Sequence, residues 1–161
     1  MTFWTIYCWF FGIYAFLVFL NYIFDFTERN SLLVSQLKVP KTKFVWETLY
    51  WCEQHLGTTN KRYGLDIKYY YHQKYLGTYF FHNKTITLYI GEQTTVYDLV
   101  NTIIHEYTHH LQMISNKDSV EYDTLLKTCG YDNHPMEVEA RTIADKYNDA
   151  CYDFLAKKFN F

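Results

Sequence analysis

Three side chains with the chemistry of a metal site lie close together in the sequence, at His105, Glu106 and His109. They form the pattern H-E-x-x-H, in which residues four apart share one helix face and can direct both imidazoles at a single ion. The glutamate lies about 100° round the helix from the first histidine, where it can reach a water molecule held by that ion. The pattern therefore predicts two metal ligands and a general base.

The sequence around this motif favours a helix. Thr95 and Asp98 have the spacing of a helix-capping pair, so we expect a helix to begin near Thr95. Apolar residues recur with helical periodicity on the half opposite the motif, at Val100, Ile103, Tyr107 and Leu111. The helix is therefore expected to bury one side and turn the motif elsewhere. An ordinary solvent-facing side is the alternative, although such faces are usually built of Lys and Glu rather than paired histidines.

A catalytic zinc also needs a third protein ligand and an open position. Residues 135–156 have the periodicity of a second amphipathic helix, with Pro135 suited to its first position. Glu137 and Glu139 lie in its first turns, on either side of the apolar stripe. Either carboxylate could complete the site, and the alternative is that both only favour the helix dipole.

The pairing of H-E-x-x-H with E-x-x-A about thirty residues later resembles the gluzincin branch of zinc metallopeptidases. In pattern it is most similar to the small ImmA/IrrE-like peptidases and the minigluzincins, over residues 94–156. The resemblance implies one Zn²⁺ ion held by His105, His109 and Glu137, with Ala140 as the matching small residue. Glu139 stays open as an alternative third ligand.

One position departs from the family pattern. Many relatives carry Asp four places after the glutamate ligand, where it supports a zinc-binding histidine, whereas this chain has Arg141. The supporting role would then fall to Glu139 or Asp145.

The resemblance implies zinc-dependent hydrolysis of peptide bonds in a protein or peptide substrate. Glu106 would act as general base on the water that zinc activates. His134, just before the second helix, either helps to stabilise the tetrahedral oxyanion or caps the helix, and Tyr122 and Tyr131 are weaker candidates for the first role. Gln112 lies on the same helix face as the motif and could line the cleft.

The predicted fold class is α+β, with a small zincin-like domain. Its expected elements are a helix over 43–56, a three-stranded antiparallel sheet (65–72, 75–82 and 85–90), the motif helix and the ligand helix. An edge strand beside the site could pair with an extended peptide substrate.

The N-terminus predicts a membrane anchor. Residues 3–24 carry no charged side chain and as a helix would span about 33 Å, enough for a bilayer core of about 30 Å. A signal peptide is the alternative, but the basic start, short apolar stretch and small-residue cleavage site are missing. The predicted organisation is therefore a transmembrane anchor at 1–26, a linker at 27–42 and the zincin-like domain at 43–161.

Charge and cysteine usage suggest the location of that domain. Arg29, Lys38 and Lys41 follow the apolar stretch and no basic residue precedes it, which favours a single-pass protein with its C-terminal domain on the cytoplasmic side. The cysteines are few and widely spaced, as expected of reduced thiols. The net charge of −2 provides no basic excess for nucleic acid. A membrane-anchored zinc domain with a structural or interaction role, and no catalysis, is the alternative function.

Overall fold

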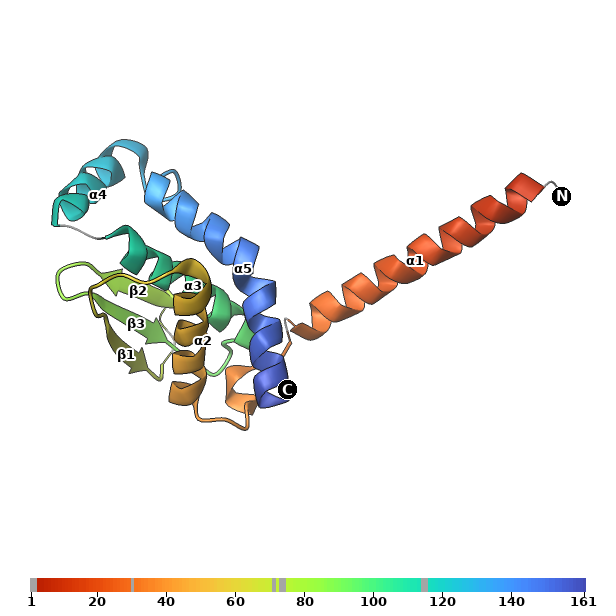
Figure 1. The fold of residues 1–161 in the computed structure, drawn as a ribbon, viewed down its shortest axis with the longest axis horizontal. Helices are drawn as coiled ribbons and strands as arrows, with labels where there is room; N and C mark the ends of the chain where they lie inside the picture. Colours follow the sequence, from red (N-terminus) through yellow and green to blue (C-terminus); the bar gives the residue numbers. More distant parts are fainter. Residues whose placement is uncertain (1–2, 30, 71, 73–74, 114–115) are drawn as a thin grey trace. The chain divides into compact units, whose positions relative to one another are not determined.

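The computed structural model describes residues 3–29, 31–70, 72, 75–113 and 116–161 (Figure 1). The chain divides into two compact units, Met1–Leu32 and Leu33–Phe161. The described part contains five α-helices, one short 3-10 helix and three strands, which makes it an α+β protein.

The first unit contains helix α1, Phe3–Arg29. No helix in the described ranges, α1 included, combines the length and the apolarity needed to cross a membrane. This finding overturns the predicted anchor at 1–26, the membrane contact through residues 3–24, and the single-pass location and orientation that depended on them. The prediction equated an uncharged stretch with an apolar one. Trp and Tyr carry N–H and O–H groups and Asn21 carries an amide, all of which resist transfer to hydrocarbon.

The second unit is built on a three-stranded sheet of β1 (Gly64–Lys68), β2 (Gly77–Phe80) and β3 (Thr85–Tyr89). The strand order is β1-β3-β2. β2 pairs antiparallel with β3 through the expected hairpin, but β1 pairs parallel with β3, with Gly64 opposite Thr85. The sheet is therefore mixed, and the predicted antiparallel sheet is wrong. The segment between β1 and β2 is long enough for β2 to lie at the opposite edge of the sheet from β1, so β3 occupies the middle position.

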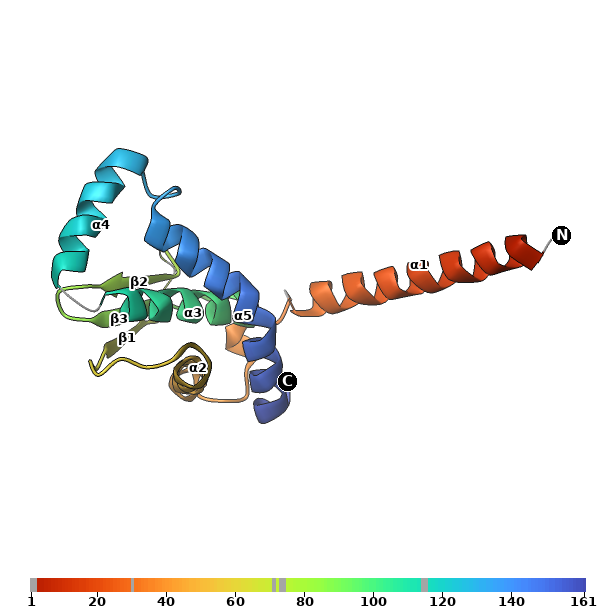
Figure 2. The same ribbon diagram turned by 45° about the horizontal axis from the view of Figure 1, so that its top comes forward.

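The helices of this unit agree with the sequence pattern except for α4, which the sequence did not predict. They are α2 (Lys41–Leu56), α3 (Val96–Gln112), α4 (Asn116–Cys129) and α5 (Pro135–Phe159), with the 3-10 helix η1 (Val34–Gln36) before them. Gly57 ends α2 with a φ of 96°, a conformation that favours glycine. α4 connects α3 to α5 (Figure 2).

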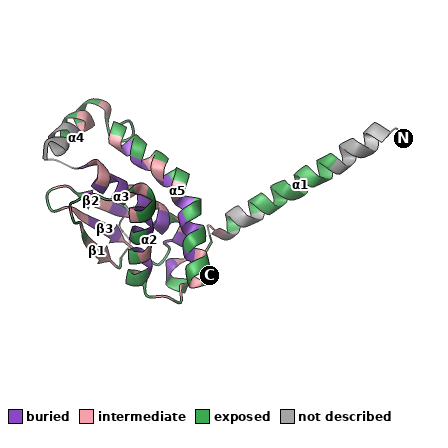
Figure 3. Ribbon diagram, viewed as in Figure 1, coloured by how far each residue is buried: buried purple, intermediate pink, exposed green. Residues whose placement is uncertain are grey.

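Helix α3 lies at the centre of the second unit. It packs against β2 and β3, against α2, and most extensively against α5. Figure 3 shows that α3 and β3 are largely buried. Fully buried apolar side chains from the sheet and from three helices form the core, among them Phe44, Leu88, Ile103 and Leu155. Burial of this apolar surface holds α3 and α5 in fixed positions, and these two helices carry the candidate site.

Candidate metal centre

Local signals set where the motif helix begins. The Thr95 hydroxyl accepts a hydrogen bond from the Asp98 backbone N–H at 3.0 Å, so the predicted helix start with Thr95 as its cap is confirmed. The helix then runs without interruption to Gln112, and the backbone N–H of Met113 closes its last turn on the His109 carbonyl at 3.0 Å. His105 and His109 therefore lie one turn apart on one face of α3.

His134 fixes the start of α5. Its Nδ1 accepts a hydrogen bond from the Met136 backbone N–H at 3.2 Å, and its Nε2 donates to the Tyr122 carbonyl at 3.2 Å. The ring is fully buried, and Pro135 follows at the first helical position. These contacts correspond to the capping alternative, because they engage both ring nitrogens. The proposed oxyanion role of His134 stays a prediction.

Three side chains from α3 and α5 converge. The two imidazole Nε2 atoms of His105 and His109 lie 3.1 Å apart. His105 Nε2 lies 3.3 Å from Glu137 Oε2, and His109 Nε2 lies 3.3 Å from Glu137 Oε1. Tetrahedral zinc with bonds of about 2.0–2.1 Å keeps its ligand atoms about 3.3–3.4 Å apart. The contacts between neighbouring side chains are close to this spacing, and the group of two imidazoles and one carboxylate can hold a metal ion.

One oxygen of this cluster has no hydrogen-bond partner in the part of the chain that the structure describes, although a ring nitrogen of His105 lies 3.3 Å from it. Glu137 Oε2 is buried without a hydrogen-bond partner. A buried carboxylate oxygen left unpaired is costly, and a cation would satisfy it. The His105 side chain is 15% exposed, whereas His109 and Glu137 are 6% and 3% exposed, so His105 forms the solvent side of the cluster. Solvent can approach from there to an open coordination position.

The electrostatics of the cluster favour positive charge. Burial alone would raise the pKa of Glu137, but the two imidazoles against it and a hydrogen bond from Tyr122 hold that pKa well below its usual value. Burial likewise disfavours charge on His109, yet contact with Glu137 and the charge of Glu106 outweigh it and raise the pKa of His109. A site that stabilises a carboxylate and attracts protons also attracts a metal cation.

Tyrosines support Glu137 from the α4 side. The Tyr122 hydroxyl donates to Glu137 Oε1 at 2.7 Å, and burial followed by this hydrogen bond raises the pKa of Tyr122. The half-exposed Tyr131 also has a raised pKa, through burial and then its interaction with the Glu137 carboxylate. Both phenols therefore stay protonated beside the site, where they can donate.

Glu106 lies beside the cluster and is held by the edge strand β2. Its carboxylate accepts a hydrogen bond from the Tyr79 backbone N–H. Burial raises its pKa to about 7, and the nearby His109 and His105 rings and the Tyr79 N–H oppose this rise. A Cβ atom at Gly77 would lie 2.8 Å from Glu106 Cγ, so the strand backbone packs directly on the glutamate side chain. Glycine at this position permits that approach.

The remaining acidic candidates do not join the ligand atoms. Glu139 accepts a hydrogen bond from Gln112 at 2.9 Å, and Asp145 accepts one from Asn101 at 3.3 Å. Arg141 pairs with Asp132 rather than with a glutamate of α5. The third converging side chain is therefore Glu137. Glu139 contacts Gln112, which in turn contacts His109.

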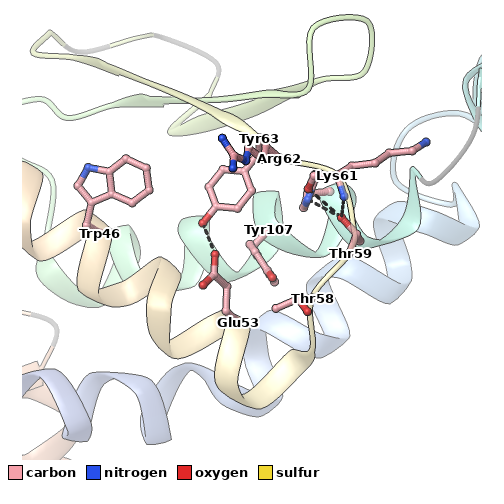
Figure 4. A pocket seen from close by; sticks show the side chains of 9 residues that line it. Trp46, Glu53, Thr58, Thr59, Lys61, Arg62, Tyr63 and Tyr107 are labelled. Carbon is pink, nitrogen blue, oxygen red and sulfur yellow. Dashed lines mark hydrogen bonds between the residues drawn. The ribbon is translucent and has the colours of Figure 1, made fainter.

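The opposite side of α3 holds a different kind of site. Tyr107 and His110 line a pocket of about 310 Å³ that also includes Trp46, Glu53 and Tyr63 (Figure 4). Figure 4 shows the Tyr63 hydroxyl directed at Glu53, to which it donates at 2.9 Å. The Tyr107 hydroxyl donates to the Gly57 carbonyl at 2.7 Å. These groups satisfy one another, so this pocket lacks the convergent lone pairs of the metal cluster.

Sequence reasoning missed how the strand and the ligand helix are tied to α3. Gly77 and Tyr79 belong to no sequence motif. Their contact with Glu106 becomes visible only in the structure, where β2 packs against α3. Gln112 was noted as a lining residue, but its bond to His109 could have been inferred from its place three residues later on the same face.

Comparison with known proteins found no matching family model, no matching curated protein and no matching solved structure. The family resemblance therefore stays an expectation that rests on the motif residues.

Proposed function

We propose that this chain is a zinc-dependent peptidase of gluzincin type, with His105, His109 and Glu137 as metal ligands and Glu106 as general base. The observation that carries the proposal is the convergence of two imidazole nitrogens and one carboxylate at 3.1–3.3 Å, with a buried oxygen left without a hydrogen bond. Two imidazoles and one carboxylate this close together suit zinc.

Glu106 is the reason to propose catalysis rather than a structural ion. A structural zinc site is usually closed by four Cys or His ligands, whereas this set has three ligands with a partly exposed His105. The bound ion would lower the pKa of a water molecule and polarise a substrate carbonyl. Glu106 would take the proton from that water and pass it to the leaving amine.

The supporting residues have separate tasks in this scheme. The Tyr79 N–H and the backbone of Gly77 hold the Glu106 side chain against α3. Tyr122 holds Glu137, which leaves the second carboxylate oxygen free for the ion. β2 is an edge strand of the described sheet and lies beside Glu106, a position that suits pairing with an extended peptide and supports a peptide substrate.

The proposal is tested with the purified full chain loaded with zinc. Metal content is measured by mass spectrometry, and cleavage of a mixed peptide library is followed with and without a chelator. We expect one zinc per chain and chelator-sensitive cleavage. Glu106→Gln should keep the zinc and lower turnover by about 10²–10⁴-fold, the usual contribution of a general base.

Each other outcome has a distinct meaning. Stoichiometric zinc without cleavage would favour the non-enzymatic zinc domain over the peptidase. If the chain binds no zinc, both the peptidase and the non-enzymatic zinc domain are ruled out. Unchanged turnover in Glu106→Gln would remove Glu106 from its assigned role.

A further inference from the structure

Gln112 connects the two helices that carry the candidate ligands. It is the last residue of α3, and its Oε1 lies 2.8 Å from His109 Nδ1. Its Nε2 lies 3.1 Å from the Met136 carbonyl oxygen and 2.9 Å from Glu139 Oε2. One amide group thus contacts a ligand ring on α3 and two groups in the first turns of α5.

The partners of this amide determine its orientation. The Met136 carbonyl and the Glu139 carboxylate are acceptors only, so the Gln112 NH₂ group must face α5 and use both of its hydrogens there. Its oxygen then faces His109, and His109 must carry its proton on Nδ1 to donate to it. The lone pair of His109 is therefore left on Nε2, the atom that points at Glu137.

The α5 contacts lie on both sides of the carboxylate ligand. Met136 immediately precedes Glu137, and Glu139 follows it by two residues. Because Gln112 holds both, it fixes the distance between the end of α3 and the first turn of α5. This distance decides whether the Glu137 carboxylate reaches the imidazoles.

We infer that Gln112, itself oriented by Glu139, is a positioning residue of the metal centre. It fixes the proton of His109 on Nδ1 and holds Glu137 in reach of the ion. The inference rests on the metal-binding half of the proposed function and is independent of whether peptide bonds are cleaved.

The first test compares two amides that join the same two helices. The Asn101 amide donates to Asp145 at 3.3 Å, and none of the described hydrogen bonds joins it to a candidate ligand. Zinc affinity of the full chain is measured by competition with a chromophoric chelator. Gln112→Ala should weaken zinc binding by about 10–100-fold, the usual effect of losing a group that orients a ligand, while Asn101→Ala should leave it unchanged.

A second readout reports on the geometry of the site itself. With Co²⁺ in place of zinc, the visible absorption bands depend on ligand arrangement. Gln112→Ala should shift or weaken these bands, and Asn101→Ala should reproduce the wild-type spectrum. A general loss of helix packing would affect both variants alike and would contradict a role specific to the metal centre.

An exchange of the two partners tests the hydrogen bonds directly. Gln112→Glu keeps an acceptor for His109 but sets two carboxylates against each other, so zinc binding should weaken. Adding Glu139→Gln restores a donor between them, and the double variant should recover most of the lost affinity. This comparison carries the test if Gln112→Ala does not fold.

The outcomes separate this inference from the proposed function. If the wild-type chain binds no zinc, both fail. If it binds zinc and Gln112→Ala matches the wild type in affinity and Co²⁺ spectrum, the positioning role alone is overturned. The positioning role would also be overturned if the double variant bound zinc no more tightly than Gln112→Glu alone.

Discussion

His109 and His110 are neighbours in the sequence, and both are buried on α3, but they are held in opposite ways. Gln112 Oε1 accepts a hydrogen bond from His109 Nδ1, which leaves the Nε2 lone pair directed at Glu137. His110 Nδ1 lies 3.1 Å from the Tyr79 hydroxyl, and its Nε2 lies 3.0 Å from the Thr59 hydroxyl.

The hydroxyl partners of His110 determine its tautomer. The Thr59 hydroxyl hydrogen goes to the Lys61 carbonyl, so Thr59 must accept from His110 Nε2. His110 Nδ1 then accepts from Tyr79, and no lone pair remains for a metal. The difference indicates that an imidazole is available as a metal ligand when its neighbours supply an acceptor for one nitrogen and leave the other without a donor.

The assigned difference between His109 and His110 would be wrong if both rings contributed equally to zinc binding. Truncation by His109→Ala removes one of three ligands, so we expect one zinc per chain in the wild type and only background zinc in the variant after gel filtration. Metal content by mass spectrometry checks this. The matched control is His110→Ala, which should keep its zinc. Equal zinc loss in both variants would contradict the assignment.

The contact between β2 and Glu106, the proposed general base, provides a second comparison. In Gly77→Ala the new Cβ would lie 2.6 Å from Thr102 Cγ2 and 2.8 Å from Glu106 Cγ, so the Glu106 side chain must shift. Misplacing a catalytic group by about 1 Å can lower turnover by about 10²-fold, while the zinc ligands stay in place. Turnover and zinc affinity are measured together.

Gly64→Ala is the matched control for this strand substitution. Gly64 lies in β1, and its Cβ would meet Thr85 Oγ1 of β3 at 2.9 Å rather than Glu106. It should strain the sheet without a specific loss of turnover. If both variants lose turnover in proportion to their loss of stability, the contact with Glu106 has no catalytic importance.

The smallest effect is expected on the structural side of α3. His110→Ala leaves the buried Tyr79 hydroxyl without its acceptor, which should lower the free energy of unfolding by about 1–3 kcal/mol. Urea unfolding of the full chain measures this change. An unchanged free energy of unfolding would show that His110 does not hold β2 against α3.

The sequence predicted the parts of the site that depend on local spacing. H-E-x-x-H and the Thr95 cap act within one helix, so periodicity alone places His105 and His109 on one face. Pro135 marked the start of α5 in the same way. The choice of Glu137 over Glu139 came from the family resemblance, because both lie in the same two turns and only packing against α3 distinguishes them.

Features that depend on long-range packing were missed or wrong. The strand order β1-β3-β2 depends on which strands pair across the sheet, and no local pattern in the sequence records that pairing. α4 has a weak apolar pattern and was not predicted. The N-terminal prediction failed for a different reason, because the absence of charge over residues 3–24 was taken as a measure of hydropathy.

The candidate ligands come from both ends of the stretch that contains α4. His105 and His109 precede it and Glu137 follows it, so one bound ion would act as a cross-link that closes this loop. A cross-link of this kind restricts the unfolded chain, and a ligand that binds only the native state adds stability as its concentration rises. The melting temperature of the second unit should therefore depend on free zinc, and chelation should release the α4 segment before the sheet.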